Sequence, residues 1–252
     1  MSGIDLTAAP TSPGPTDAAT QDRRLLRWGG VAGLGGVFLL LASVVVVLSF
    51  GLPDAADLET LTDFDDLEVG RIAEHFLYLG ALVLFALHVV VLRRALHAAD
   101  PAAALFGAVV ALFGFVILAA SSVLHVSTAA LSDLYEDPSR SADGRESIEY
   151  AWAGAQSVFD TMLVTGLLLV PVGLALLGVA MRHAPGFGPR LATSCLVLGG
   201  LGFVGAAIET VDTSTDLSAL SVLAMVAFSL IVGWRLLRLG SEAAARDAAA
   251  AQ

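Results

Sequence analysis

Carboxylate, imidazole and hydroxyl side chains recur within stretches of this chain that are otherwise apolar. The run from Arg71 to Arg94, "RIAEHFLYLGALVLFALHVVVLRR", contains Glu74, His75 and His88. Ionisable residues inside an apolar helix are costly, and they usually face a bundle interior or a wet cavity. Such groups can relay protons, bind cations or ligate a metal ion. Their positions are therefore where any chemistry is expected.

Three later apolar stretches carry comparable groups, each near one end. The first has a hydroxyl and an imidazole, the second a carboxylate and a hydroxyl, and the third two carboxylates. In chain order they are Ser121 and His125, Asp160 and Thr161, and Glu209 and Asp212. Because Ser121 and His125 are four residues apart, they share one helix face.

The elements that carry these groups have the composition of membrane spans. Apolar residues make up 56% of the 252 residues and charged residues only 15%, with a mean hydropathy of +0.80. A hydrocarbon layer about 30 Å thick needs roughly 20 apolar residues per helix. The apolar runs are continuous rather than alternating, which indicates helices and not the strands of a barrel. Six segments are long enough, at residues 29–52, 72–92, 102–125, 156–181, 191–210 and 217–237.

The pattern predicts an all-α, polytopic membrane protein, with a six-helix bundle over residues 27–239. Residues 1–26 are rich in Pro, Thr and Ala without periodicity, so we expect a disordered cytoplasmic tail there. Residues 240–252 form a second, polar cytoplasmic tail. The first span is too long for a signal peptide, and we expect it to be retained.

The arginines predict the orientation of the bundle. Positively charged loops stay in the cytoplasm. The expected inner side holds ten arginines, which are Arg23, Arg24, Arg27, Arg93, Arg94, Arg182, Arg190, Arg235, Arg238 and Arg246. The outer side holds only Arg71, Arg140 and Arg145. Both termini are therefore expected in the cytoplasm, with the chain in the cytoplasmic membrane.

The charge composition excludes some functions. All thirteen basic residues are Arg, and without Lys the chain cannot form a retinal Schiff base or other lysine–carbonyl adduct. Most of the 24 acidic residues fall in two expected outer loops, an excess that favours a halophilic prokaryote as the source. These acidic loops argue against nucleic acid as a partner. The expected partners are the lipid bilayer and a small polar solute or cation.

Counting along the helices places the polar groups of four spans at one level, the outer third of the membrane. Three interpretations are open. The groups can be structural, joining helices through hydrogen bonds, as in a scaffold or accessory subunit. They can line an outward-facing cavity for a proton, cation or small solute, with Glu74, Asp160 and Glu209 as its charges. They can also bind zinc through His75 and His125 with Asp160 or Glu209, although no cofactor is otherwise expected.

The zinc interpretation has a partial likeness in known enzymes. Ser121, His125 and Asp160 resemble the Ser-His-Asp arrangement of intramembrane zinc hydrolases of the ceramidase and progestin-receptor type. The resemblance implies a metal-dependent hydrolase as the alternative function. Those enzymes also have a late HxxxH helix and seven spans, whereas this chain has no His after His183 and six spans.

The remaining features are expected to be structural. The first outer loop repeats Leu58, Leu61, Phe64 and Leu67 every three residues, which favours a short helix tethered to the bilayer surface rather than a lid. His88 is expected to find a partner inside the bundle. Cys195, the one cysteine, excludes an internal disulfide. An offset of 86 residues pairs His97 with His183 and Gly114 with Gly200, a faint echo between two hairpins.

The hairpin "GLLLVPVGLALLGVAMRHAPGFGPRLATSCLVLGGLGFVGA", with its "FGPR" turn at residues 187–190, resembles an uncharacterised family of six-span prokaryotic membrane proteins. The resemblance extends from Arg27 to Leu239 and implies the six-helix fold. It implies no activity. The expectation from the residues is therefore small-solute or ion handling, with the hydrolase and the scaffold as alternatives.

Overall fold

The computed structural model describes residues 15–52, 58–62, 64–212 and 215–250. Within these residues the secondary structure is entirely helical. The helices are α1 (Pro15–Phe50), α2 (Leu58–Thr62), α3 (Phe64–Leu96), α4 (Pro101–Ser127), α5 (Ala129–Glu136), α6 (Ala142–Arg182), α7 (Gly188–Val211) and α8 (Ala219–Ala250).

Six of the helical segments are long and apolar enough to cross a membrane, which confirms the predicted helical class and the number of apolar segments. They are Thr20–Phe50, Leu67–Leu96, Pro101–Glu136, Ala142–Arg182, Gly188–Val211 and Ala219–Ala245. Several are longer than predicted. α6 has 41 residues, so at 1.5 Å per residue it extends about 60 Å, roughly twice the thickness of a hydrocarbon layer. α1 begins at Pro15, inside the region predicted as a tail, whereas residues 1–14 lie outside the described part.

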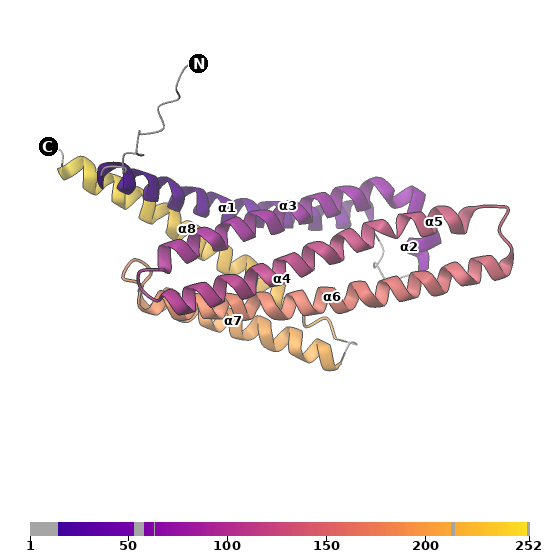
Figure 1. Cartoon of the computed structure of the whole chain (residues 1–252). Helices are drawn as coiled ribbons and strands as arrows, with labels where there is room; N and C mark the ends of the chain where they lie inside the picture. The colour runs from indigo at the N-terminus through magenta and orange to yellow at the C-terminus, as the bar shows by residue number, and fades with distance from the viewer. Residues whose placement is uncertain (1–14, 53–57, 63, 213–214, 251–252) are drawn as a thin grey trace, which may run out of the picture.

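The six long helices pack as a ring. Each contacts the next along the chain, in the order α1, α3, α4, α6, α7 and α8, and α8 returns to pack on α1 (Figure 1). At the α1–α8 contact, a Cβ on Gly30 would lie 2.7 Å from the carbonyl oxygen of Gly233. The start of α1, the end of α8 and the α3–α4 and α6–α7 turns lie at one end of the bundle (Figure 1).

A close backbone contact in the ring joins α4 to α6. Two glycines seven residues apart on α4, Gly107 and Gly114, face two with the same spacing on α6, Gly166 and Gly173. A Cβ on Gly173 would lie 2.5 Å from the backbone nitrogen of Ala111 and 2.7 Å from the Gly107 carbonyl oxygen. Small residues allow this approach, and dispersion attraction between the closely packed atoms then stabilises the contact of α4 with α6.

The α5–α6 turn is organised by local hydrogen bonds. Ser141 caps α6 by accepting a hydrogen bond from the backbone N–H of Gly144 at 3.2 Å. Asp137 accepts hydrogen bonds from the hydroxyl and the backbone N–H of Ser139, at 2.7 and 2.9 Å. These bonds favour the ionised carboxylate and hold the pKa of Asp137 below its usual range. Pro171 lies inside α6, and the helix continues through it.

The end of the bundle at α2 and the α5–α6 turn carries a small apolar core of its own. Leu61 of α2 is fully buried and packs with Ile148 and Trp152 of α6, with Leu131 and Tyr135 of α5 beside them. The hydroxyl of Ser132 donates to the Leu61 carbonyl at 2.6 Å. The prediction that this helix is tethered to the bilayer surface was therefore wrong for Leu61, because the α5–α6 hairpin extends far enough to bury it. Residues 53–57 and 63 lie outside the described part.

We expect Gly173→Ala to destabilise the protein by about 1–3 kcal/mol, because the added methyl overlaps the α4 backbone and the helices must separate. Thermal unfolding in detergent would measure the change. Gly200→Ala on α7 is the matched control, since a Cβ there meets nothing within 4 Å, and its melting temperature should equal or exceed that of the wild type. Equal melting temperatures for both variants would contradict the α4–α6 contact.

Candidate functional site

The α3–α4 contact brings together two of the histidines that the sequence singled out. The imidazole rings of His75 and His125 stack with their centroids 5.0 Å apart and their planes inclined by 12°. The Phe159 ring of α6 packs against the His125 ring, with the two ring centroids 5.0 Å apart. Both histidines are buried, at 7% and 2% exposure. The stacked pair therefore lies between α3, α4 and α6, at the level where α2 covers the bundle.

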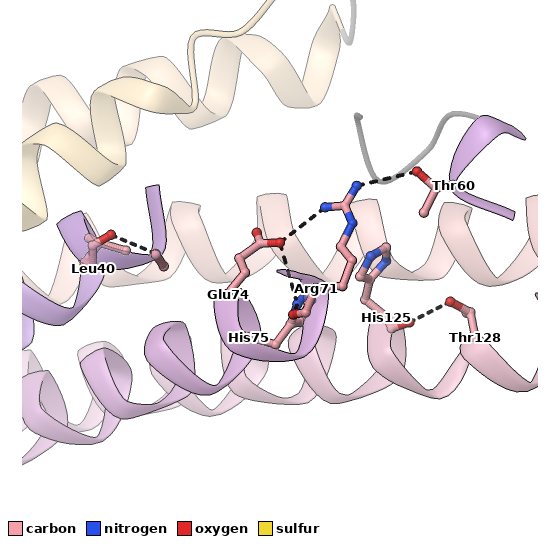
Figure 2. Close-up of polar contacts among 8 residues, drawn as sticks. Leu40, Thr60, Arg71, Glu74, His75, His125 and Thr128 are labelled. Atoms are coloured by element: carbon pink, nitrogen blue, oxygen red, sulfur yellow. Dashed lines mark hydrogen bonds and ion pairs between the residues drawn. The ribbon is translucent and has the colours of Figure 1, made fainter. Parts of the chain in front are cut away.

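A buried arginine connects the histidine pair to α2. The Arg71 guanidinium lies 3.2 Å from the Glu74 carboxylate and makes a long, 3.5 Å hydrogen bond to the Thr60 hydroxyl (Figure 2). Arg71 and Thr60 are 4% and 0% exposed. A buried guanidinium is costly unless it is paired, so Glu74 offsets much of the charge of Arg71. α2 is thereby joined to the site by a polar contact as well as by Leu61.

Glu74 also faces the histidine pair. Its Oε2 lies 3.8 Å from Nδ1 of His75, and its side chain is 23% exposed, more than those of its two partners. His75 Nδ1 lies 2.8 Å from the Arg71 carbonyl oxygen, so a proton on Nδ1 is donated to that oxygen. Nε2 is then the nitrogen free to accept a proton. A spatial row of titratable side chains thus runs from the partly exposed Glu74 inward to His75 and His125.

Buried polar groups without partners lie beside His125. Gln156 and Trp152 are one and two turns from Phe159 along one face of α6, and Ser122 follows Ser121 on α4. Among the residues that the structure describes, none accepts from or donates to the Gln156 amide, the Trp152 Nε1 or the Ser122 hydroxyl. Buried atoms of this kind usually bind water or a small polar ligand, because leaving them unsatisfied costs about 1–3 kcal/mol each.

Other residues predicted for the site lie elsewhere. Asp160 and Thr161 are on the exposed side of α6, where the Thr161 hydroxyl donates to the Ser157 carbonyl. Glu209 of α7 accepts a hydrogen bond from the backbone N–H of Ser218, just before α8. Asp212 is exposed at the end of α7. The spans carry these groups at the expected ends, and Asp160, Thr161 and Asp212 are exposed there whereas the two histidines are buried.

The zinc set expected from the sequence does not fit this arrangement. Imidazole binds a metal through a lone pair in the ring plane, whereas His75 and His125 meet face to face. Ser121 donates its hydroxyl to the Leu118 carbonyl at 2.8 Å. In the described ranges, no three His, Cys, Asp or Glu side chains are placed to hold one metal ion. The same stacked geometry does not suit a haem iron between the rings.

His88 has the structural role that the sequence predicted. It is fully buried, and its Nδ1 lies 2.8 Å from the Gly29 carbonyl oxygen of α1, to which it donates. The ring meets Phe228 of α8 edge-on. A Cβ on Gly33 would lie 2.7 Å from Nδ1, so α1 is held close against the ring. Cys195 is a free, buried thiol.

The sequence did not point to four of the residues in the site. From the sequence, Arg71 is only an outer charge, Thr60 part of a loop and Gln156 part of a span, and nothing singles out Trp152. Arg71 and Glu74 are three residues apart, a helical spacing that signals an ion pair. The signal for Gln156 is weaker. It consists only of an amide side chain one helical turn from a phenylalanine within an apolar run.

No family model matches the chain, and neither a curated protein nor a solved structure matches it. The function therefore rests on the geometry of the residues themselves.

We expect Leu61→Ala to loosen α2, because the truncated side chain leaves a cavity against Ile148 and Trp152 that costs about 2–5 kcal/mol. Amide hydrogen exchange measures the effect, which should be faster exchange in residues 58–62. Leu134→Ala makes the same change at an exposed leucine of α5 and should leave the exchange of α2 unchanged. Unchanged exchange of α2 in Leu61→Ala would show that α2 does not depend on this contact.

Proposed function

We propose that the chain is a multi-pass protein of a prokaryotic cytoplasmic membrane, with both termini in the cytoplasm. The support is the six apolar helices and the arginine-rich end at which the termini and two turns lie. The acidic, lysine-free composition supports a halophilic source. The Arg71–His125 site then lies toward the outer side of the membrane, with α2 above it.

The proposed activity is proton handling from the outer side. The observation that carries it is a spatial row of three titratable side chains. Glu74 is partly exposed, its Oε2 lies 3.8 Å from Nδ1 of His75, and the His75 ring stacks on the buried ring of His125. Two charged imidazoles 5.0 Å apart would repel by about 3 kcal/mol at an effective dielectric constant of 20. The two rings together therefore carry at most one proton beyond those of their neutral forms, which Glu74 attracts and Arg71 opposes. Because the rings meet face to face, that proton passes between their in-plane nitrogens through a bound water or polar group rather than directly.

The unpartnered groups beside His125 extend this chemistry. Gln156 and Ser122 offer a donor and acceptors within a buried region. Polar groups of this kind bind water molecules that conduct protons, or a small polar solute that moves with a proton. A proton or a protonated small solute is therefore the best-supported substrate class.

Glu74→Gln should slow proton uptake roughly tenfold, because the amide neither accepts a proton nor stabilises a charged His75. The measurement uses liposomes containing the reconstituted protein and a trapped pH dye, with a potassium gradient and valinomycin to impose a voltage. Glu68→Gln is the matched control, since Glu68 is an exposed carboxylate on the same helix, and it should retain the wild-type rate.

His125→Phe separates proton exchange from packing. Phenylalanine preserves the ring between His75 and Phe159 but has no nitrogen, so the variant should fold normally and show the same loss of uptake as Glu74→Gln. Proton uptake no faster than in protein-free liposomes, or an unchanged rate in both variants, would refute the proposal.

The orientation has its own test. Ser139 is exposed in the α5–α6 turn and Pro185 in the α6–α7 turn. In a Cys195→Ala background, Ser139→Cys should react with a membrane-impermeant maleimide in intact cells, whereas Pro185→Cys should react only after lysis. The reverse pattern would place the termini outside.

A further inference from the structure

A cavity lies at the opposite end of the bundle from the histidine pair. It has a volume of about 1070 Å³ and is formed by α1, α3, the α6–α7 turn and α8. This is the end where the start of α1, the end of α8 and the α3–α4 turn lie (Figure 1). We call it the basic cleft. The proton-handling chemistry makes no use of it.

The charges of the cleft are mainly positive. Arg93, Arg94, His97 and His183 line it, with Asp22 as the one carboxylate among its lining residues. Asp22 pairs with Arg94 at 2.9 Å. Within the described residues, no carboxylate forms an ion pair with Arg93 or His97, and both are exposed. The cleft therefore offers the Arg93 guanidinium and an imidazole N–H of His97 to an incoming anion.

His183 is held at the rim by a carboxylate outside the cleft lining. Its Nδ1 lies 3.5 Å from Asp100, the residue whose side chain caps α4. His97 and His183 are the pair related by the offset of 86 residues, and both come to this cleft from the ends of α3 and α6. Arg235 donates to the carbonyl of Gly186, a lining residue, at 2.7 Å, and its charge is paired with Glu242 at 3.0 Å.

The walls of the cleft are apolar. Leu25 and Leu26 of α1, Val90 and Val91 of α3 and Phe187 of the α6–α7 turn line it below the charged rim. An inorganic anion would gain no binding energy from these apolar walls, because apolar surface contributes to affinity only when other apolar surface covers it. A ligand that matches the whole cleft has an anionic head and a hydrocarbon chain.

We propose that the basic cleft binds an anionic phospholipid of the cytoplasmic leaflet, with its phosphate at Arg93 and His97 and an acyl chain along the apolar wall. Arginine forms forked hydrogen bonds with phosphate oxygens, and basic pockets between helices on the cytoplasmic side are suited to lipid head groups. The inference rests on the proposed membrane placement but is independent of proton handling, because its test measures lipid binding alone.

The test titrates the purified full-length protein in detergent with dioctanoyl phosphatidylglycerol, and in parallel with dioctanoyl phosphatidylcholine. We expect phosphatidylglycerol to bind at least about tenfold more tightly, since each basic residue near the head group contributes about 1 kcal/mol. The double variant Arg93→Gln/His97→Gln should lose about tenfold in affinity. Val90→Trp, which narrows the cleft without changing its charge, should weaken binding as well.

Arg190→Gln is the matched control, because Arg190 is exposed at the same end of the bundle and does not line the cleft. It should bind phosphatidylglycerol within about twofold of the wild type. The proposal is overturned if phosphatidylcholine binds equally well or if Arg190→Gln loses as much affinity as the double variant. Displacement of the lipid by an equal concentration of inorganic phosphate would assign the cleft to free phosphate instead. Circular dichroism melting checks that each variant is folded.

Discussion

The structure depends first on the close approach of α4 and α6, where four glycines remove the side chains that would hold two backbones apart. In lipid, helices gain nothing from leaving water, so dispersion between closely packed backbones replaces the hydrophobic effect as the attraction. The contact fixes how each helix is rotated, and this rotation directs His125 and Phe159 inward while Asp160 faces out. α6 also extends beyond this contact to α2, which it supports through Ile148 and Trp152.

How far the sequence predicts this arrangement differs between residues. The six apolar segments and the shared level of Glu74, His75 and His125 follow from counting residues, because helix rise is nearly constant. The separation of Glu209 from that group does not follow, since it depends on which side of α7 meets α8. The burial of Leu61 does not follow either, because nothing in residues 142–155 indicates that this part of α6 packs against α2.

The site combines an ion pair and an imidazole stack that constrain each other. Arg71 needs Glu74 because a lone guanidinium at 4% exposure is unfavourable, and Glu74 is in turn the nearest negative charge to His75. The two glycines paired by the offset of 86 residues differ in packing, since Gly114 lies in the α4–α6 contact whereas a Cβ on Gly200 would meet nothing within 4 Å.

The return of α8 onto α1 has a consequence for biosynthesis. Gly30 and Gly233 meet across that contact, yet among the six long helices of the described residues α1 is synthesised first and α8 last. Until α8 follows, the matching surface of α1 has no partner, and the other five helices form an open arc. Closure of the ring is therefore the last packing step among these helices, and a chain truncated before α8 would leave that surface of α1 available to chaperones or to proteolysis.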